Sequence, residues 1–152
     1  MKVLELGHVV LYVRNLDISK KFYADILGWK QIGSIGDIAT LHSSGRTHHE
    51  LLLIEVGQNA KSIPSGTRVG MYHFGIKIGE SDQELIQAMG ILKKSNVRIL
   101  GSSDHIVTHS IYISDPDGNE IEIYIDVQPE TWRNQPELIA SEPKPLNIFD
   151  EN

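Results

Sequence analysis

The chain has 152 residues, a formal net charge of −6 and no cysteine. The missing cysteines exclude disulfides, thiolate metal ligands and a cysteine nucleophile, and the negative charge disfavours a nucleic acid partner because phosphates would be repelled. No stretch approaches the roughly 20 apolar residues of a membrane span, and the N-terminus lacks the pattern of a signal peptide. We therefore expect a cytoplasmic protein.

The first half of the chain predicts a strand, a helix and three further strands. Residues 4–13 are rich in β-branched and apolar side chains and predict the first strand. Asn15 or Asp17 can cap a helix over about 17–27. Three short strands follow, near residues 29–35, 37–42 and 49–56.

The second half repeats this pattern. Residues 71–78 predict a strand, and Ser81 or Asp82 can cap a helix over about 82–95. The sequence DPDGN at 115–119 predicts a hairpin turn. Three more strands are expected, near residues 97–101, 108–114 and 119–126.

The chain is therefore β-α-β-β-β twice, an α+β fold with modules at about 1–56 and 70–127. We expect both modules to form a single domain over residues 1–127. Residues 128–152 carry four of the six prolines and many polar side chains. They predict a C-terminal tail that lies over the domain or is partly disordered, with Trp132 as its anchor.

On each of three strands in this repeat, one face is apolar and the other carries a side chain that can bind a metal. The two faces differ because side chains alternate across a strand. These side chains are His8, His73 and Glu122. If the apolar faces lie under helices, the polar faces line a common interior, where two imidazoles and a carboxylate suit Fe(II), Zn, Mn or Ni. A lone histidine beside a strand is more often structural, however, so the pattern alone leaves both interpretations open.

Three segments make the pattern specific: GHVVLYVRNLDISKKFYADILGW, YHFGIKI and SDPDGNEIEIY. Over residues 4–132 the chain resembles the vicinal oxygen chelate superfamily, which includes glyoxalase I, bleomycin-resistance proteins and type I extradiol dioxygenases. The resemblance implies paired βαβββ modules that form an eight-stranded, half-open barrel around a divalent metal. By position, His8, His73 and Glu122 match the metal ligands of that superfamily.

Within the superfamily, the stretch from residue 103 to 132 looks most like catechol 2,3-dioxygenase-type proteins. The resemblance implies that His49, in the His48-His49 pair, is an acid–base group beside the metal. It also implies that His105 and Tyr112 contact the substrate or dioxygen. The implied function is Fe(II)-dependent extradiol cleavage of a catecholic ring, for which a neutral histidine can accept a proton.

Glu50 supports a different interpretation. In glyoxalase I-like and epimerase members, a Glu or Gln on this strand is a fourth metal ligand, and the chemistry is isomerisation. On a regular strand His49 and Glu50 point to opposite faces, so the two interpretations exclude each other. A third alternative is a non-catalytic protein that sequesters a ligand. In each case we expect a small-molecule ligand and a homodimer.

Overall fold

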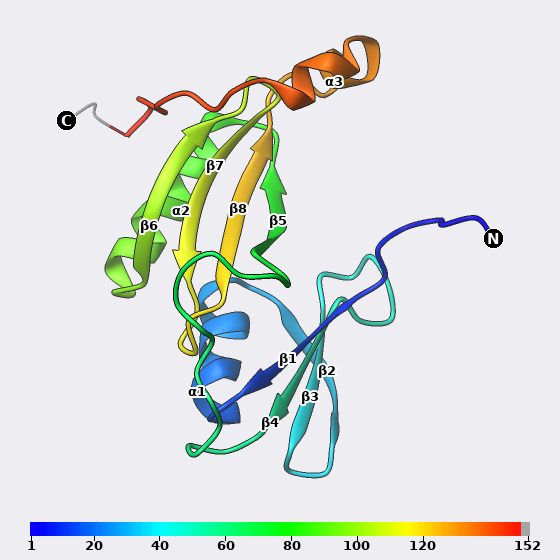
Figure 1. The fold of residues 1–152 in the computed structure, drawn as a ribbon, viewed down its shortest axis with the longest axis vertical. Helices are drawn as coiled ribbons and strands as arrows, with labels where there is room; N and C mark the ends of the chain where they lie inside the picture. Colours follow the sequence, from blue (N-terminus) through cyan, green and yellow to red (C-terminus); the bar gives the residue numbers. More distant parts are fainter. Residues whose placement is uncertain (150–152) are drawn as a thin grey trace. The chain divides into compact units, whose positions relative to one another are not determined.

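The computed structural model describes residues 1–149, which form two compact units divided between Pro64 and Ser65. Each unit is built on a mixed four-stranded sheet with a helical segment (Figure 1). The last three residues of the predicted tail, 150–152, lie outside the described part of the chain. No helix within residues 1–149 combines the length and the apolar character that a membrane crossing requires.

Unit 1 contains the predicted strand, helix and three strands. Its elements are β1 (Val9–Val13), α1 (Leu16–Lys20), η1 (Lys21–Ile26), β2 (Lys30–Ile35), β3 (Ala39–Ser43) and β4 (Leu51–Glu55). The sheet order is β1-β4-β3-β2, with β1 parallel to β4 and the other pairs antiparallel. Helix α1 begins as predicted, because the Asn15 side chain accepts a hydrogen bond from Ile18 N at 2.9 Å.

Two strand boundaries of unit 1 differ from the prediction. Strand β1 begins at Val9 and not at residue 4, so His8 precedes it. Strand β4 begins at Leu51, so His49 and Glu50 also precede their strand. Both residues end the loop between β3 and β4, so the alternation of a regular strand does not by itself determine where their side chains point.

Unit 2 repeats the topology of unit 1. Its elements are β5 (His73–Gly79), α2 (Asp82–Lys94), β6 (Arg98–Asp104), β7 (Thr108–Ser114), β8 (Glu120–Asp126), α3 (Pro129–Asn134) and η2 (Pro136–Ala140). The sheet order is β5-β8-β7-β6, again with the first pair parallel. The two equivalent sheet orders confirm the predicted β-α-β-β-β repeat. The predicted tail contains α3 and η2.

The predicted hairpin between β7 and β8 is present and is organised by one acidic side chain. The Asp115 carboxylate accepts hydrogen bonds from the backbone N of Asp117 at 2.9 Å and of Asn119 at 2.7 Å. Gly118 has a φ of +93°, a conformation that glycine adopts without strain. This short turn fixes the register in which β7 and β8 pair.

Strand β8 separates an apolar face from a polar face. Ile121, Ile123 and Ile125 are at most 3% exposed, whereas Glu122 and Tyr124, on the other face, are half-buried. Helix α2 packs against β5, β7 and β8 through its own buried side chains. The polar face is thereby left for functional side chains, as the alternation predicts.

Helix α2 is capped by a carboxylate that lies against a glycine. Glu84 Oε2 accepts hydrogen bonds from Glu80 N at 2.9 Å, from Ser81 N at 3.0 Å and from Ser81 Oγ at 2.7 Å. A Cβ atom at Gly79 would overlap this carboxylate. The glycine therefore makes room for the capping box, which supplies partners for the free N–H groups at the start of the helix.

Replacing Gly79 by alanine is expected to lower the free energy of unfolding by about 1–2 kcal/mol, because the displaced Glu84 carboxylate can no longer cap α2. The measurement is urea denaturation followed by circular dichroism. Gly101→Ala is the matched control, since no atom lies within 4 Å of the added Cβ, and it should stay within about 0.5 kcal/mol of the unmodified protein. Equal stability of the two variants would contradict this role for Gly79.

Candidate metal and catalytic site

Strands β5 and β8 bring His73 and Glu122 together on the polar face of unit 2. His73 Nε2 lies 3.5 Å from Glu122 Oε2. Two ligands bound about 2.1 Å from one metal, at tetrahedral or octahedral angles, are themselves roughly 3.0–3.4 Å apart. This pair of donor atoms therefore suits one divalent metal after a small adjustment.

Within residues 1–149 the other ring nitrogen of His73 has no hydrogen-bond partner. His73 Nδ1 is buried, and Glu120 Oε1 lies 3.6 Å from it, beyond hydrogen-bond distance. Histidines that bind a metal usually donate their second N–H group to a carboxylate or carbonyl, which orients the ring. Glu120 is placed to accept this bond after a small movement, so the surroundings of His73 fit a metal ligand.

The Glu122 carboxylate is held by two hydroxyl groups of β7. Ser110 Oγ donates to Glu122 Oε1 at 2.7 Å, and the Tyr112 hydroxyl lies 3.4 Å from the same oxygen. The Tyr112 hydroxyl is also 2.7 Å from His105 Nε2. Burial, followed by the negative charge of Glu122, raises the pKa of Tyr112 to about 12, so this hydroxyl keeps its proton at neutral pH and can donate it in a hydrogen bond.

In unit 1 the imidazole of His8 lies against that of His49. Their ring centroids are 4.5 Å apart, and the His49 Nδ1 is 2.6 Å from the Nδ1 of His48. Burial, followed by the neighbouring rings of His48 and His8, lowers the pKa of His49. This direction favours the neutral form of His49 near pH 7, and Nε2 is the ring nitrogen that His48 does not contact.

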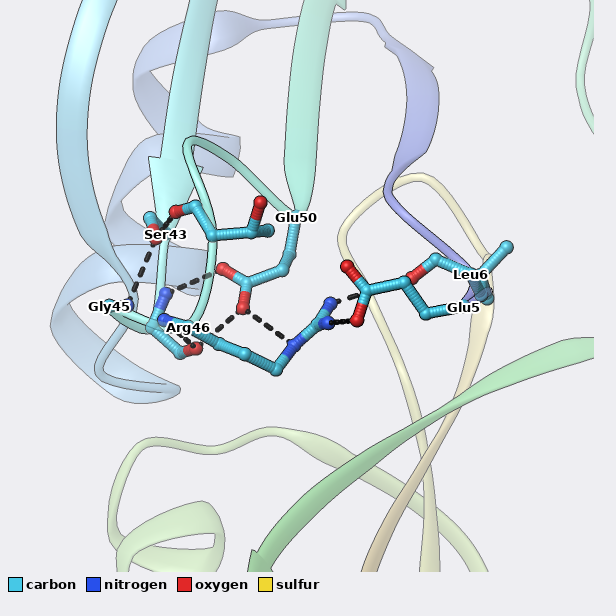
Figure 2. Close-up of polar contacts among 8 residues, drawn as sticks. Glu5, Leu6, Ser43, Gly45, Arg46 and Glu50 are labelled. Atoms are coloured by element: carbon cyan, nitrogen blue, oxygen red, sulfur yellow. Dashed lines mark hydrogen bonds and ion pairs between the residues drawn. The ribbon is translucent and has the colours of Figure 1, made fainter. Parts of the chain in front are cut away.

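Glu50 is committed to the loop between β3 and β4, as Figure 2 shows. Its carboxylate accepts hydrogen bonds from Ser44 N at 2.8 Å and Ser44 Oγ at 2.7 Å, and it lies 3.2 Å from Arg46 Nε. Although burial favours the neutral form, the bonds from Ser44 and Ser43 and the charge of Arg46 lower the pKa of Glu50. Both carboxylate oxygens therefore have structural partners within unit 1.

Arg46 also reaches the N-terminal segment that carries His8. Its Nη1 lies 2.7 Å from Glu5 Oε2, and its Nη2 donates to the Leu6 carbonyl at 3.4 Å (Figure 2). One guanidinium group thus joins the loop before β4 to the segment before β1. This link holds the segment before β1, which carries His8, close to the loop before β4, which carries His49.

No three His, Cys, Asp or Glu side chains within residues 1–149 are gathered as one metal-binding group. His8 belongs to unit 1, whereas His73 and Glu122 belong to unit 2. The structure brings together His73 with Glu122, and His8 with His49. The metal centre with three protein ligands stays a prediction.

The sequence analysis missed three residues that shape the site: Ser110, Glu120 as a partner of His73, and Arg46. Ser110 could have been found, because it shares a face of β7 with Tyr112, whereas Ile111 and Ile113 lie on the opposite face. Arg46 gave no such signal, since its role depends on the path of a loop.

The fold and this site can now be compared with known proteins. A model of the glyoxalase/bleomycin resistance protein/dioxygenase superfamily matches residues 5–123. The chain belongs to this superfamily. The predicted resemblance to the vicinal oxygen chelate superfamily is thereby confirmed, and the paired βαβββ topology matches its fold.

Two curated relatives from this superfamily differ in function and in length. Catechol-2,3-dioxygenase of Bacillus subtilis is 33% identical over 132 residues, which are 87% of this chain but 45% of the relative. The chain thus spans less than half of that relative. Metallothiol transferase FosB of Staphylococcus epidermidis is 31% identical, and the match covers 99% of both chains.

A solved structure of the superfamily shares the fold. The glyoxylase/bleomycin resistance protein/dioxygenase domain from Frankia sp. EAN1pec superposes with a TM-score of 0.66 at 24% identity, over 82% of this chain and 99% of that one. This likeness supports the fold alone and does not choose a reaction.

Glu122→Gln is expected to weaken Zn²⁺ binding at least tenfold, because the amide removes the negative charge of a predicted ligand. Glu50→Gln should leave the affinity within twofold, because the Glu50 carboxylate is occupied by Ser44 and Arg46. Isothermal titration calorimetry on metal-stripped protein measures both. A large loss of affinity in the Glu50 variant would instead support Glu50 as a fourth ligand.

Proposed function

We propose that this protein is an Fe(II)-dependent extradiol dioxygenase-like enzyme that acts on a small catecholic substrate as a homodimer, with His8, His73 and Glu122 as its metal ligands. The observation that carries the proposal is the hydrogen-bonded series from His105 through Tyr112 to Glu122, at 2.7 and 3.4 Å. It places two proton-donating groups beside a candidate ligand. The 33% identity to a catechol-2,3-dioxygenase supports the same reaction.

His49 is the proposed base. When bound, the divalent metal supplies a Lewis acid that can hold both oxygens of a vicinal diol. The short contact between the Nδ1 atoms of His48 and His49 requires that one of them carries the proton. If His49 Nδ1 donates to His48, the Nε2 of His49 has a free lone pair and can take a proton from the diol.

Tyr112 and His105 are the proposed substrate contacts. The hydroxyl of Tyr112 donates its one proton to Glu122 Oε1, and its oxygen can accept a hydrogen bond from His105 in the tautomer that is protonated at Nε2. A rotation about the C–O bond would turn this proton towards an oxygen of the substrate, while the hydroxyl oxygen still accepts a hydrogen bond from His105. The pair can therefore stabilise negative charge that develops on the substrate.

The isomerase alternative requires Glu50 as a ligand. Its carboxylate would have to give up Ser44 and Arg46 to reach a metal. Breaking these bonds in a nearly buried position carries an energetic cost, because the Glu50 carboxylate would lose the hydrogen bonds from Ser44 and the charge of Arg46. The structure of the loop therefore favours the dioxygenase proposal over the isomerase alternative.

A metal-dependent thiol transferase is the second candidate. The observation in its favour is length, because the match to the metallothiol transferase FosB covers 99% of both chains. His8, His73 and Glu122 would also be the metal ligands of such a transferase. In this case His49 would act on the thiol or the electrophile, and the diol-binding role proposed for Tyr112 and His105 would not be needed.

The test is anaerobic reconstitution with Fe(II), followed by addition of oxygen and a panel of catechols. We expect yellow ring-opened products, and we expect His49→Gln to lower kcat by about 10²–10⁴-fold, the usual contribution of a general base. The iron content of the variant should equal that of the unmodified protein, since His49 is not a proposed ligand.

The same preparations discriminate the second candidate. Protein loaded with Mn²⁺ is incubated with fosfomycin and either cysteine or glutathione, and loss of free thiol is followed. Consumption of thiol without turnover of any diol would replace the dioxygenase proposal with the transferase. Activity in neither assay from fully loaded protein would contradict both.

A further inference from the structure

Unit 2 contains a pocket of about 540 Å³ that extends from Glu122 towards the C-terminal segment. Gly75, Tyr124 and Glu122 belong to its polar side, and Trp132 and Ile139 belong to α3 and η2. The volume falls within the range of about 300–1,000 Å³ that is typical of small-molecule sites. Glu122, the proposed ligand, is therefore continuous with a space larger than the metal alone requires.

The C-terminal segment from Pro129 to Lys144, here called the strap, is attached to the sheet at both of its ends. At the first end, β8 leads into Gln128, whose φ of 52° turns the chain into α3 (Figure 1). At the second end, Asp104 and Lys144 pair through two backbone hydrogen bonds of 2.9 and 2.8 Å. The strap is thus held beside the pocket by main-chain contacts.

The strap presents apolar side chains that the protein does not bury. Neither α3 nor η2 contains a buried residue, and Ile139 is 58% exposed although it lines the pocket. Val107, at the turn between β6 and β7, also lines the pocket but is itself buried. Apolar area that remains open to solvent inside a pocket is area that a ligand can cover with a gain in free energy.

The charges at this end of the pocket are already paired. Lys77 Nζ lies 2.6 Å from Asp126 Oδ2 and 2.8 Å from Glu80 Oε1. The Tyr124 hydroxyl makes no hydrogen bond within the described residues and is half-buried. The polar groups that line this end are therefore the carboxylate of Asp126, which is paired with Lys77, and the hydroxyl groups of Thr108 and Tyr124.

From the exposed apolar side chains of the strap in the pocket that contains Glu122, we infer that Trp132 and Ile139 determine specificity. The substrate is then a vicinal diol with a bulky apolar substituent, aromatic or branched, which contacts the strap. The inference rests on the proposed function, because the diol end is assigned to the metal. It goes beyond that function by naming the substituent and the residues that select it. Trp132, as a large flat side chain, is well suited to contact a ring.

Binding of catechol and of 4-phenylcatechol tests the inference. Both affinities are measured by calorimetry without oxygen on Zn²⁺-loaded protein, in which the metal is not redox-active and no turnover occurs. We expect 4-phenylcatechol to bind at least tenfold more tightly than catechol. Trp132→Ala should reduce this preference to less than threefold, and Ile139→Ala should reduce it in part.

Two further variants test whether the effect of Trp132→Ala could come from loss of folding. Trp132→Phe keeps a ring and should retain most of the preference, whereas Glu137→Ala, on the exposed side of η2, should leave it unchanged. In a Trp29→Phe background, Trp132 is the one tryptophan of the chain. Its fluorescence should then be quenched by 4-phenylcatechol.

Each outcome separates the inference from the proposed function. A folded Trp132→Ala variant with the full preference, or an unquenched Trp132, would overturn the inference even if ring cleavage is observed. Conversely, a preference that depends on Trp132 in a protein that cleaves no diol would leave the strap as a specificity element and remove the dioxygenase proposal.

Discussion

The candidate site depends on the separation of an apolar and a polar face along β8. In β8, burial of Ile121, Ile123 and Ile125 under α2 forces the alternate side chains, among them Glu122, to the other face. The favourable free energy comes from the apolar side, at roughly 25 cal/mol per Å² of buried surface. The packing of the apolar face thus fixes the position of the polar face. The residue at position 122 does not contribute to this packing, so selection can act on its chemistry alone.

This same separation explains how much of the fold and the site could be predicted. All eight strands and both main helices follow from periodicity and caps, because burial of one face requires a matching pattern in the sequence. The pairing of His73 with Glu122 and the placement of Tyr112 follow from the same alternation. The strand boundaries at Val9 and Leu51 were missed by a few residues, since pattern alone defines the ends of elements poorly.

What could not be predicted depends on loops. The sequence pattern predicts that His49 and Glu50 lie on opposite faces of a strand, but both residues end a loop. Hydrogen bonds from Ser44 and the charge of Arg46 determine where the Glu50 carboxylate points. Such contacts join residues whose spacing carries no period. The contribution of Trp132 and Ile139 to the pocket has the same cause, because it requires the left-handed turn at Gln128.

The attachment of the strap has an evolutionary consequence. Because its ends are fixed by the turn after β8 and by main-chain pairing with Lys144, the side chains between them are under little constraint from folding. Substitutions there can accumulate without disturbing the sheet or the residues around Glu122. A lineage that carries this segment could therefore change the compounds it accepts while the reaction itself is inherited unchanged.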